Sequence, residues 1–176
     1  PKAAPGDYYA KFRSGNDSTE VPFTILADPN YKTSNEEYSE QVNFLLSIRD
    51  KFSDVMKALK NIKEVRQQMA DFNARNGKDV PKEIKQQIDT INKQMTVVEE
   101  ALHQTKAKSG QDVLNYPIRL DDKLAGVYRA AAVGNAAPSK QAKEAYTDLA
   151  GQIDVQLGKL KKVLTEDVGK LNQMIH

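Results

Sequence analysis

The chain has 176 residues, of which 39% are hydrophobic and 28% charged, a balance that suits one helical domain with a small additional element. Basic residues number 26 and acidic residues 24, so the formal net charge is only +2, and the two signs are mixed along the chain. This pattern argues against nucleic acid as a partner, and zero cysteines exclude disulfide bonds and thiolate chemistry. No apolar run approaches the roughly 20 residues of a membrane span.

Residues 5–25 alternate between apolar and polar side chains with the period of a β-strand. The apolar positions of the two runs are Tyr8, Ala10, Phe12, Val21, Phe23 and Ile25. Turn-forming residues at 14–18 separate the runs and predict a β-hairpin. A two-stranded hairpin is marginal in water, and Pro22 removes one ladder donor, so we expect the strands to need a further sheet or a helical surface.

Two long helices are predicted next, near residues 35–75 and 81–105. Ser34 and Glu37 have the spacing of a capping box, which satisfies free backbone amides at a helix start. The first helix has one continuous apolar face: Tyr38, Val42, Leu45, Phe52, Met56, Leu59, Ile62, Met69 and Phe72. The second has a coiled-coil-like seam: Ile84, Ile88, Ile91, Met95, Val98 and Leu102.

The remaining helices are predicted near residues 117–133 and 139–175. The last helix keeps one apolar face, with a stutter where four-residue steps follow one another. Between the second and third helices, residues 106–116 contain breaking signals. We expect this loop to bulge from the molecule, with Val113, Leu114 and Tyr116 folding back onto the core; it serves either as a binding loop or, more simply, as a connection that keeps register.

Helix lengths decide how these pieces assemble. At about 1.5 Å per residue, the first and last helices reach roughly 61 and 56 Å, and the two middle helices placed end to end match them. The sequence therefore predicts a mainly α fold, a long antiparallel up-down-up bundle of three layers whose middle rod is broken into two helices. The β-hairpin occupies residues 1–30 and the bundle residues 31–176.

Histidines and paired acids are the candidates for chemistry. Glu100 and His103 have the E-x-x-H spacing of di-iron bundles, but such sites need a second copy, and the other histidine is His176 at the end of the chain. We interpret both histidines as surface residues. Glu99 and His103, four residues apart, offer two metal ligands without a third. The sequence thus predicts no catalytic, cofactor-binding or metal-binding residues, and no cofactor.

Adjacent acidic residues raise the question of a two-carboxylate hydrolase site. They are Glu36-Glu37, Glu99-Glu100, Asp121-Asp122 and Glu166-Asp167. Neighbours in a helix project about 100° apart rather than converging. Each pair is therefore interpreted as a solvated face, and the lysine clusters at 57–63 and 159–162 as solubilising charges.

Three stretches carry a resemblance to a known group of proteins. These are the junction DPNYKTS, the helix start NYPIRL and the helix start APS at residues 137–139. With the preceding strands, they resemble the C-terminal region of large secreted bacterial proteins that have a sortilin-like, BNR-repeat β-propeller and are often labelled glycosyl hydrolases. The resemblance implies that residues 1–30 end an Ig-like or fibronectin III-like domain, that the propeller lies upstream of a cut or processed chain, and that the protein is periplasmic or extracellular.

The leading functional expectation is a noncatalytic structural or interaction module at the C-terminus of such a protein. Its partners would be the upstream propeller and Ig-like domains, with a further protein partner or a homodimer as other options. The alternative is an accessory part of a glycosyl hydrolase, with residues 106–116 forming a wall of an upstream active site. We expect the hairpin to dock on the first turns of the first long helix through Tyr31 and Tyr38.

Overall fold

The computed structural model describes residues 1–175, with the side chains of residues 78 and 113 excepted. The elements are β1 (Gly6–Ser14), β2 (Asp17–Ile25), α1 (Asn35–Asn76), α2 (Lys82–Leu102), α3 (Leu120–Ala131), α4 (Lys140–Lys162) and α5 (Val168–Ile175). Short 3-10 turns occupy Gly77–Asp79 and Asp112–Leu114, and a π turn, Val163–Asp167, joins α4 to α5. His176 lies outside the described residues.

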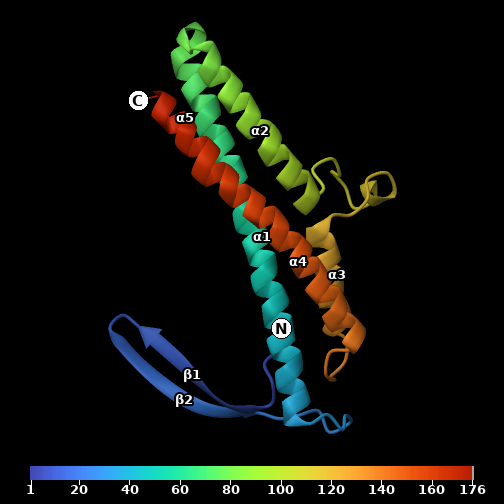
Figure 1. Ribbon diagram of the computed structural model, residues 1–176. Helices are drawn as coiled ribbons and strands as arrows, with labels where there is room; N and C mark the ends of the chain where they lie inside the picture. Colours follow the sequence, from blue (N-terminus) through green and yellow to red (C-terminus); the bar gives the residue numbers. More distant parts are fainter. Residues whose placement is uncertain (176) are drawn as a thin grey trace.

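The helices form the predicted mainly α, up-down-up bundle (Figure 1). Helix α1 runs the length of the molecule, α2 and α3 return end to end, and α4 with α5 makes the third rod. The hairpin lies at the end of the bundle where α1 begins. Breaking the middle rod thus places the waist loop, residues 103–119, on the side of the bundle.

Helix α1 begins and ends at the signals that its sequence contains. The Ser34 side chain accepts from the backbone N–H of Glu37 at 3.2 Å, and the Glu37 side chain accepts from the N–H of Ser34 at 2.8 Å, which completes the capping box. Gly77 follows the helix with φ 55°, a conformation that L side chains rarely adopt. Most of the predicted face is buried or half-buried, but Met56 is 37% exposed, so its assignment to the core was wrong.

Helix α2 contributes a complete apolar seam. All six predicted positions from Ile84 to Leu102 are buried, and they belong to one core with residues of α1, α3 and α4. The helix ends at Leu102 rather than near 105, because His103 is already extended, with φ −137° and ψ 144°. Helix α3 begins at Leu120, three residues after Pro117, since Arg119 is also extended.

The predicted stutter in the last helix takes the form of the π turn. One wider turn at Val163–Asp167 absorbs the extra residue, so that Leu160 before it and Leu171 after it are both buried on the same side. The turn also buries Val163. Gln87 of α2 donates from Nε2 to the carbonyl of Asp167 at 3.2 Å, which ties the end of the π turn to its neighbour.

The hairpin has the predicted pairing and faces. Tyr8 pairs with Phe23 and Ala10 with Val21, so these apolar side chains share one face of the sheet, and the Tyr8 and Phe23 rings stack with centroids 5.8 Å apart. The strands pair as far as Ser14 and Asp17, which makes the turn tighter than expected. Beyond its base the hairpin projects away from α1 (Figure 1), so the expected docking along the first helix turns was wrong for the strands themselves.

Candidate interaction surfaces

The apolar face of the hairpin is open to solvent. Phe12 is 60% exposed, Val21 49% and Phe23 47%. The opposite face is polar. There Nζ of Lys11 lies 2.7 Å from Oε1 of Glu20 on the neighbouring strand. The sheet has two strands, and each has one edge without a ladder partner among the described residues. An alternating sheet with one apolar face and two open edges has room to pair with further strands and to pack against another surface.

A hollow of about 540 Å³ lies where the base of the hairpin meets the bundle. Pro5, Ile25 and Leu26 line it from the hairpin side, and Tyr38 and Tyr128 line it from α1 and α3. Tyr38 is 7% exposed, and its hydroxyl has no hydrogen-bond partner among the described residues. Tyr38 therefore lies between hairpin and bundle as expected, whereas Tyr31 is 49% exposed and does not line this hollow.

Polar contacts hold the start of α1 against the connection between α3 and α4. Gln41 is buried, and its Nε2 donates to the carbonyl of Ala131 at 2.9 Å and to that of Gly134 at 3.2 Å. The hydroxyl of Thr33 donates to the carbonyl of Asn135. These bonds satisfy carbonyls at the last residue of α3 and just beyond it, and fix the end of the bundle that carries the hairpin. The role of Gln41 was not predicted, since a glutamine on an apolar stripe has no distinctive sequence signal.

At the waist, His103 and Asp121 join the two helices of the middle rod. Nδ1 of His103 lies 2.6 Å from Oδ2 of Asp121, and Oδ1 of Asp121 accepts from the N–H of Asp122 at 2.8 Å. The His103 side chain is 47% exposed, so it does reach the surface, but the Asp121 side chain is 6% exposed. The interpretation of Asp121-Asp122 as a solvated face was thus wrong for Asp121. Its partner His103 is 18 residues away in the sequence, so the three- and four-residue spacing of a helix could not predict this contact.

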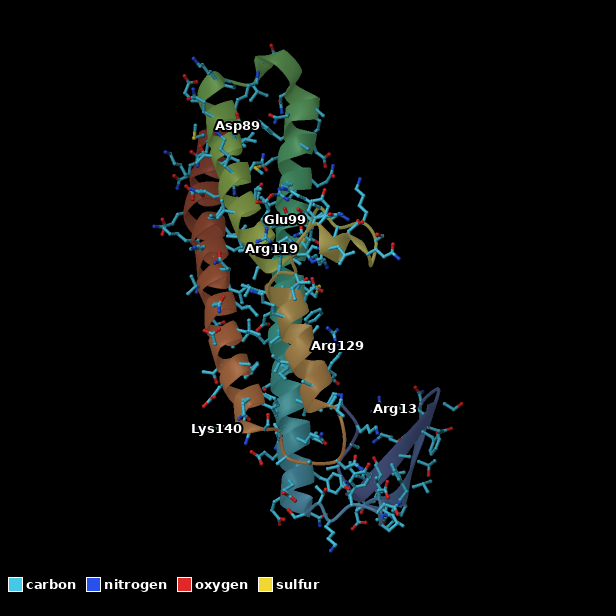
Figure 2. The ribbon with its side chains drawn as sticks, turned by 90° about the vertical axis from the view of Figure 1, so that its right-hand side faces the viewer. Arg13, Asp89, Glu99, Arg119, Arg129 and Lys140 are labelled. Carbon is cyan, nitrogen blue, oxygen red and sulfur yellow. The ribbon has the colours of Figure 1, made fainter. Side chains whose placement is uncertain are left out.

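The suggested pairing of Glu99 with His103 as metal ligands is replaced by an ion pair. Nη1 of Arg66 lies 2.5 Å from Oε2 of Glu99, and Nη2 of the same side chain donates to the Thr96 hydroxyl at 2.8 Å. The arginine joins α1 to α2 beside the waist, where Figure 2 labels Glu99. Within residues 1–175, no group of three His, Cys, Asp or Glu side chains is arranged to hold a metal ion.

The loop at 106–116 has a polar interior and an exposed tip. Asp112 accepts from the N–H groups of Lys108 at 2.6 Å and Ser109 at 2.9 Å, and from the Ser109 hydroxyl at 2.9 Å. The Lys108 N–H and the two Ser109 donors hold the pKa of Asp112 below its usual range. Leu114 is 87% exposed and Tyr116 37%, so their expected return to the core was wrong, and the Val113 side chain lies outside the described ones.

No match was found when the chain was compared with protein-family models, with curated proteins and with solved structures. Among residues 1–175, no helix combines the length and apolar character needed to cross a membrane. The surfaces described above therefore carry the functional argument.

Proposed function

We propose that this chain is a noncatalytic structural and interaction module, a helical rod whose hairpin joins a neighbouring β-rich domain. In the form that the resemblance implies, the module stands at the C-terminus of a secreted, propeller-containing protein, in the periplasm or outside the cell. The observation that carries the proposal is the exposed face formed by Phe12, Val21 and Phe23 on a two-stranded sheet with open edges.

Energetics favour a covered hairpin. Exposed apolar area costs about 25 cal/mol per Å² relative to its burial, and two-stranded sheets gain stability mainly when a third strand or a packing surface is added. An alternating apolar face is suited to the inner layer of a sandwich, where a second sheet covers it. A β-rich neighbour would supply both the missing strand and the cover.

The bundle is suited to hold such a neighbour at a defined position. Gln41 and Thr33 tie the beginning of α1 to the α3–α4 connection, and the hairpin base lies directly beside this joint. A 42-residue helix extends about 63 Å, so the far end of the rod is kept well away from the docked domain. The rod would therefore hold a partner bound at its far end at a fixed distance from the domain docked on the hairpin.

Two measurements test this function. An antibody against the helices would detect the native polypeptide in source cells and culture fractions; we expect a mass far above 19.6 kDa in an envelope or secreted fraction. Hydrogen exchange of the native protein should then show slower exchange at strand residues 7–13 than in the isolated chain. A native species near 19.6 kDa, or equal exchange in the two forms, would contradict the proposal.

The exposed tip of the waist loop favours a second candidate function, an accessory role in a glycosyl hydrolase. The loop at residues 106–116 projects from the side of the rod (Figure 1), and its exposed Leu114 is available to form a wall of a neighbouring active site. Removing residues 34–176 from the native protein should in that case abolish or strongly reduce hydrolysis. Full activity without these residues would exclude this role and leave the structural one.

A further inference from the structure

A groove runs between α2 and α4, on a part of the molecule that the proposed function does not use. Two hollows of about 360 and 350 Å³ form it. On α2 the lining passes from Gln94 through Val98 to Ala101. On the opposite rod it passes from Val163 in the π turn through Lys159 to Gln152 on α4, so the hollows adjoin along the antiparallel helices. Residues 118–120 and Lys123, from the waist loop and α3, complete the second hollow. We call this feature the α2–α4 groove.

Exposed aliphatic side chains line the α2–α4 groove. Val97 is 62% exposed, Val155 56% and Ile118 45%, while the core residue Val98 beside them is 2% exposed. One such residue on a surface is ordinary, but three of them along one groove form an apolar strip. The three residues come from α2, α4 and the waist loop, so the strip crosses from one helix to the other, and the apolar face of a further helix is suited to cover it.

Buried polar atoms without partners gather at the same place. Oε1 of Gln94, Oε1 of Gln156 and Nε of Arg119 are each buried and make no hydrogen bond within the described residues. All three side chains line the groove, and Figure 2 shows Arg119 at the waist. Buried polar groups in native proteins are almost always paired, so these two acceptors and one donor mark an incompletely satisfied part of the helix interface.

The charges around the groove have one dominant sign. Arg119, Lys123, Lys159 and Lys162 line it, against one carboxylate, Asp167. Lys162 also has Glu166 at 3.9 Å, a long and exposed ion pair that leaves most of its charge unneutralised. A basic rim around an apolar strip attracts an apolar surface that carries acidic residues.

From this combination we infer that the α2–α4 groove binds an acidic amphipathic helix of a partner protein. The groove extends from Gln152 to Val163, about 16 Å, which is the length of three helical turns. Aliphatic side chains of the partner cover Val97 and Val155, and its carboxylates pair with the basic rim. A second copy of the chain is a poorer occupant, because two basic grooves would face each other.

The test uses a fluorescent, designed peptide of roughly 18 residues, or five helical turns. Leucines stand at steps of three and four, glutamates flank them and alanines fill the rest. A matched peptide carries lysine in place of every glutamate. Fluorescence anisotropy with the full chain should show binding of the acidic peptide at least about tenfold tighter than binding of the basic one, with affinity falling as salt is added.

Protein variants locate the binding site. Val97→Glu and Val155→Glu place a charge on the apolar strip and should each weaken acidic-peptide binding by at least about tenfold. Val133→Glu is the matched control, because Val133 is 78% exposed but does not line the groove, and it should leave affinity unchanged. Circular dichroism and urea midpoints confirm that the variants remain folded.

Three outcomes would overturn the inference. The first is a lack of acidic-peptide binding to the wild-type chain, and the second is equal binding of the acidic and basic peptides. The third is a dimer, seen by sedimentation equilibrium, that Val155→Glu dissociates, since a second copy would then occupy the groove. None of these outcomes bears on the hairpin, so the proposed function is tested separately.

Discussion

His103, the first residue after α2, lies with its Nδ1 2.6 Å from Oδ2 of the buried Asp121 in the first turn of α3. This contact joins the two halves of the middle rod across the waist loop. Replacing Asp121 by alanine should lower the free energy of unfolding by about 1–3 kcal/mol, because it removes this contact and a bond to the N–H of Asp122. Urea denaturation measures the change.

A double-mutant cycle separates the His103–Asp121 contact from other effects. With His103→Ala and the double variant, the coupling free energy should reach about 1 kcal/mol. Asp122→Ala is the control, since Asp122 is exposed, and should change stability by no more than about 0.5 kcal/mol. Additive effects of the two single variants would show that the contact contributes nothing measurable.

Gln41 should contribute to stability despite its position on an apolar helix face. Gln41→Ala leaves the carbonyls of Ala131 and Gly134 without their donor, and we expect a loss of about 1–3 kcal/mol in the free energy of unfolding. Asn43→Ala, at an exposed site on the same helix, is the matched control. Equal urea midpoints for the two variants would contradict the assigned role.

The π turn should make the last helix tolerant of one specific deletion. Removing Thr165 converts the wide turn to a regular one and leaves Leu171 facing the core, so the melting temperature should fall only slightly. Removing Thr147 from the regular part of α4 shifts helix register by about 100° and displaces Tyr146 from its edge contact with Phe44.

The Thr147 deletion should therefore lower the melting temperature far more than the Thr165 deletion. The comparison is well matched, because both threonines are exposed and each donates its hydroxyl to a carbonyl four residues earlier. Similar losses from the two deletions would show that the π turn does not absorb an extra residue in the way described.

The order of the waist loop should depend on pH. The ionised carboxylate of Asp112 accepts bonds from Lys108 and Ser109, and these donors lower its pKa in the folded loop. Stabilisation is therefore complete above the ordinary aspartate pKa of about 4 and is lost as pH falls through the lowered value. The Ser109 amide shift in an NMR titration should report this transition.

Asp112→Asn provides the control for the titration. It should abolish the low-pH change in the Ser109 amide shift and, at neutral pH, speed hydrogen exchange at the N–H groups of Lys108 and Ser109, because a neutral amide oxygen is a weaker acceptor than a carboxylate. A titration midpoint at or above the ordinary aspartate range would contradict the assigned bonds.

Deleting residues 1–26 should leave a cooperative bundle with a small loss of stability. The strands project from the rod, and only the hairpin base, with Ile25 and Leu26, lines a hollow shared with α1 and α3. A single urea transition at a slightly lower midpoint is the expected result. Complete unfolding of the shortened chain would place the hairpin within the bundle core.

Periodic patterns were sufficient to predict the helices, their order and most of the core. The seam of α2 and the capping box of Ser34 and Glu37 depend on neighbours within a few residues, so local spacing contains the information that positions them. The two faces of the hairpin follow from alternation for the same reason. The stutter in the last helix could also be predicted from the sequence. Its form, a π turn that buries Val163, depends on how the last helix packs against α2.

Long-range pairing decided the features that bear on function. Asp121 is buried against His103, 18 residues away, and Gln41 bonds to carbonyls 90 and 93 residues away, so no local pattern distinguishes them from solvated residues. The α2–α4 groove arises in the same way, because Val97 and Val155 line one groove only when antiparallel packing places their helices side by side. By itself the amino-acid sequence determined which segments are helix and which faces are apolar; tertiary packing decided which polar groups are buried and which apolar strips remain uncovered.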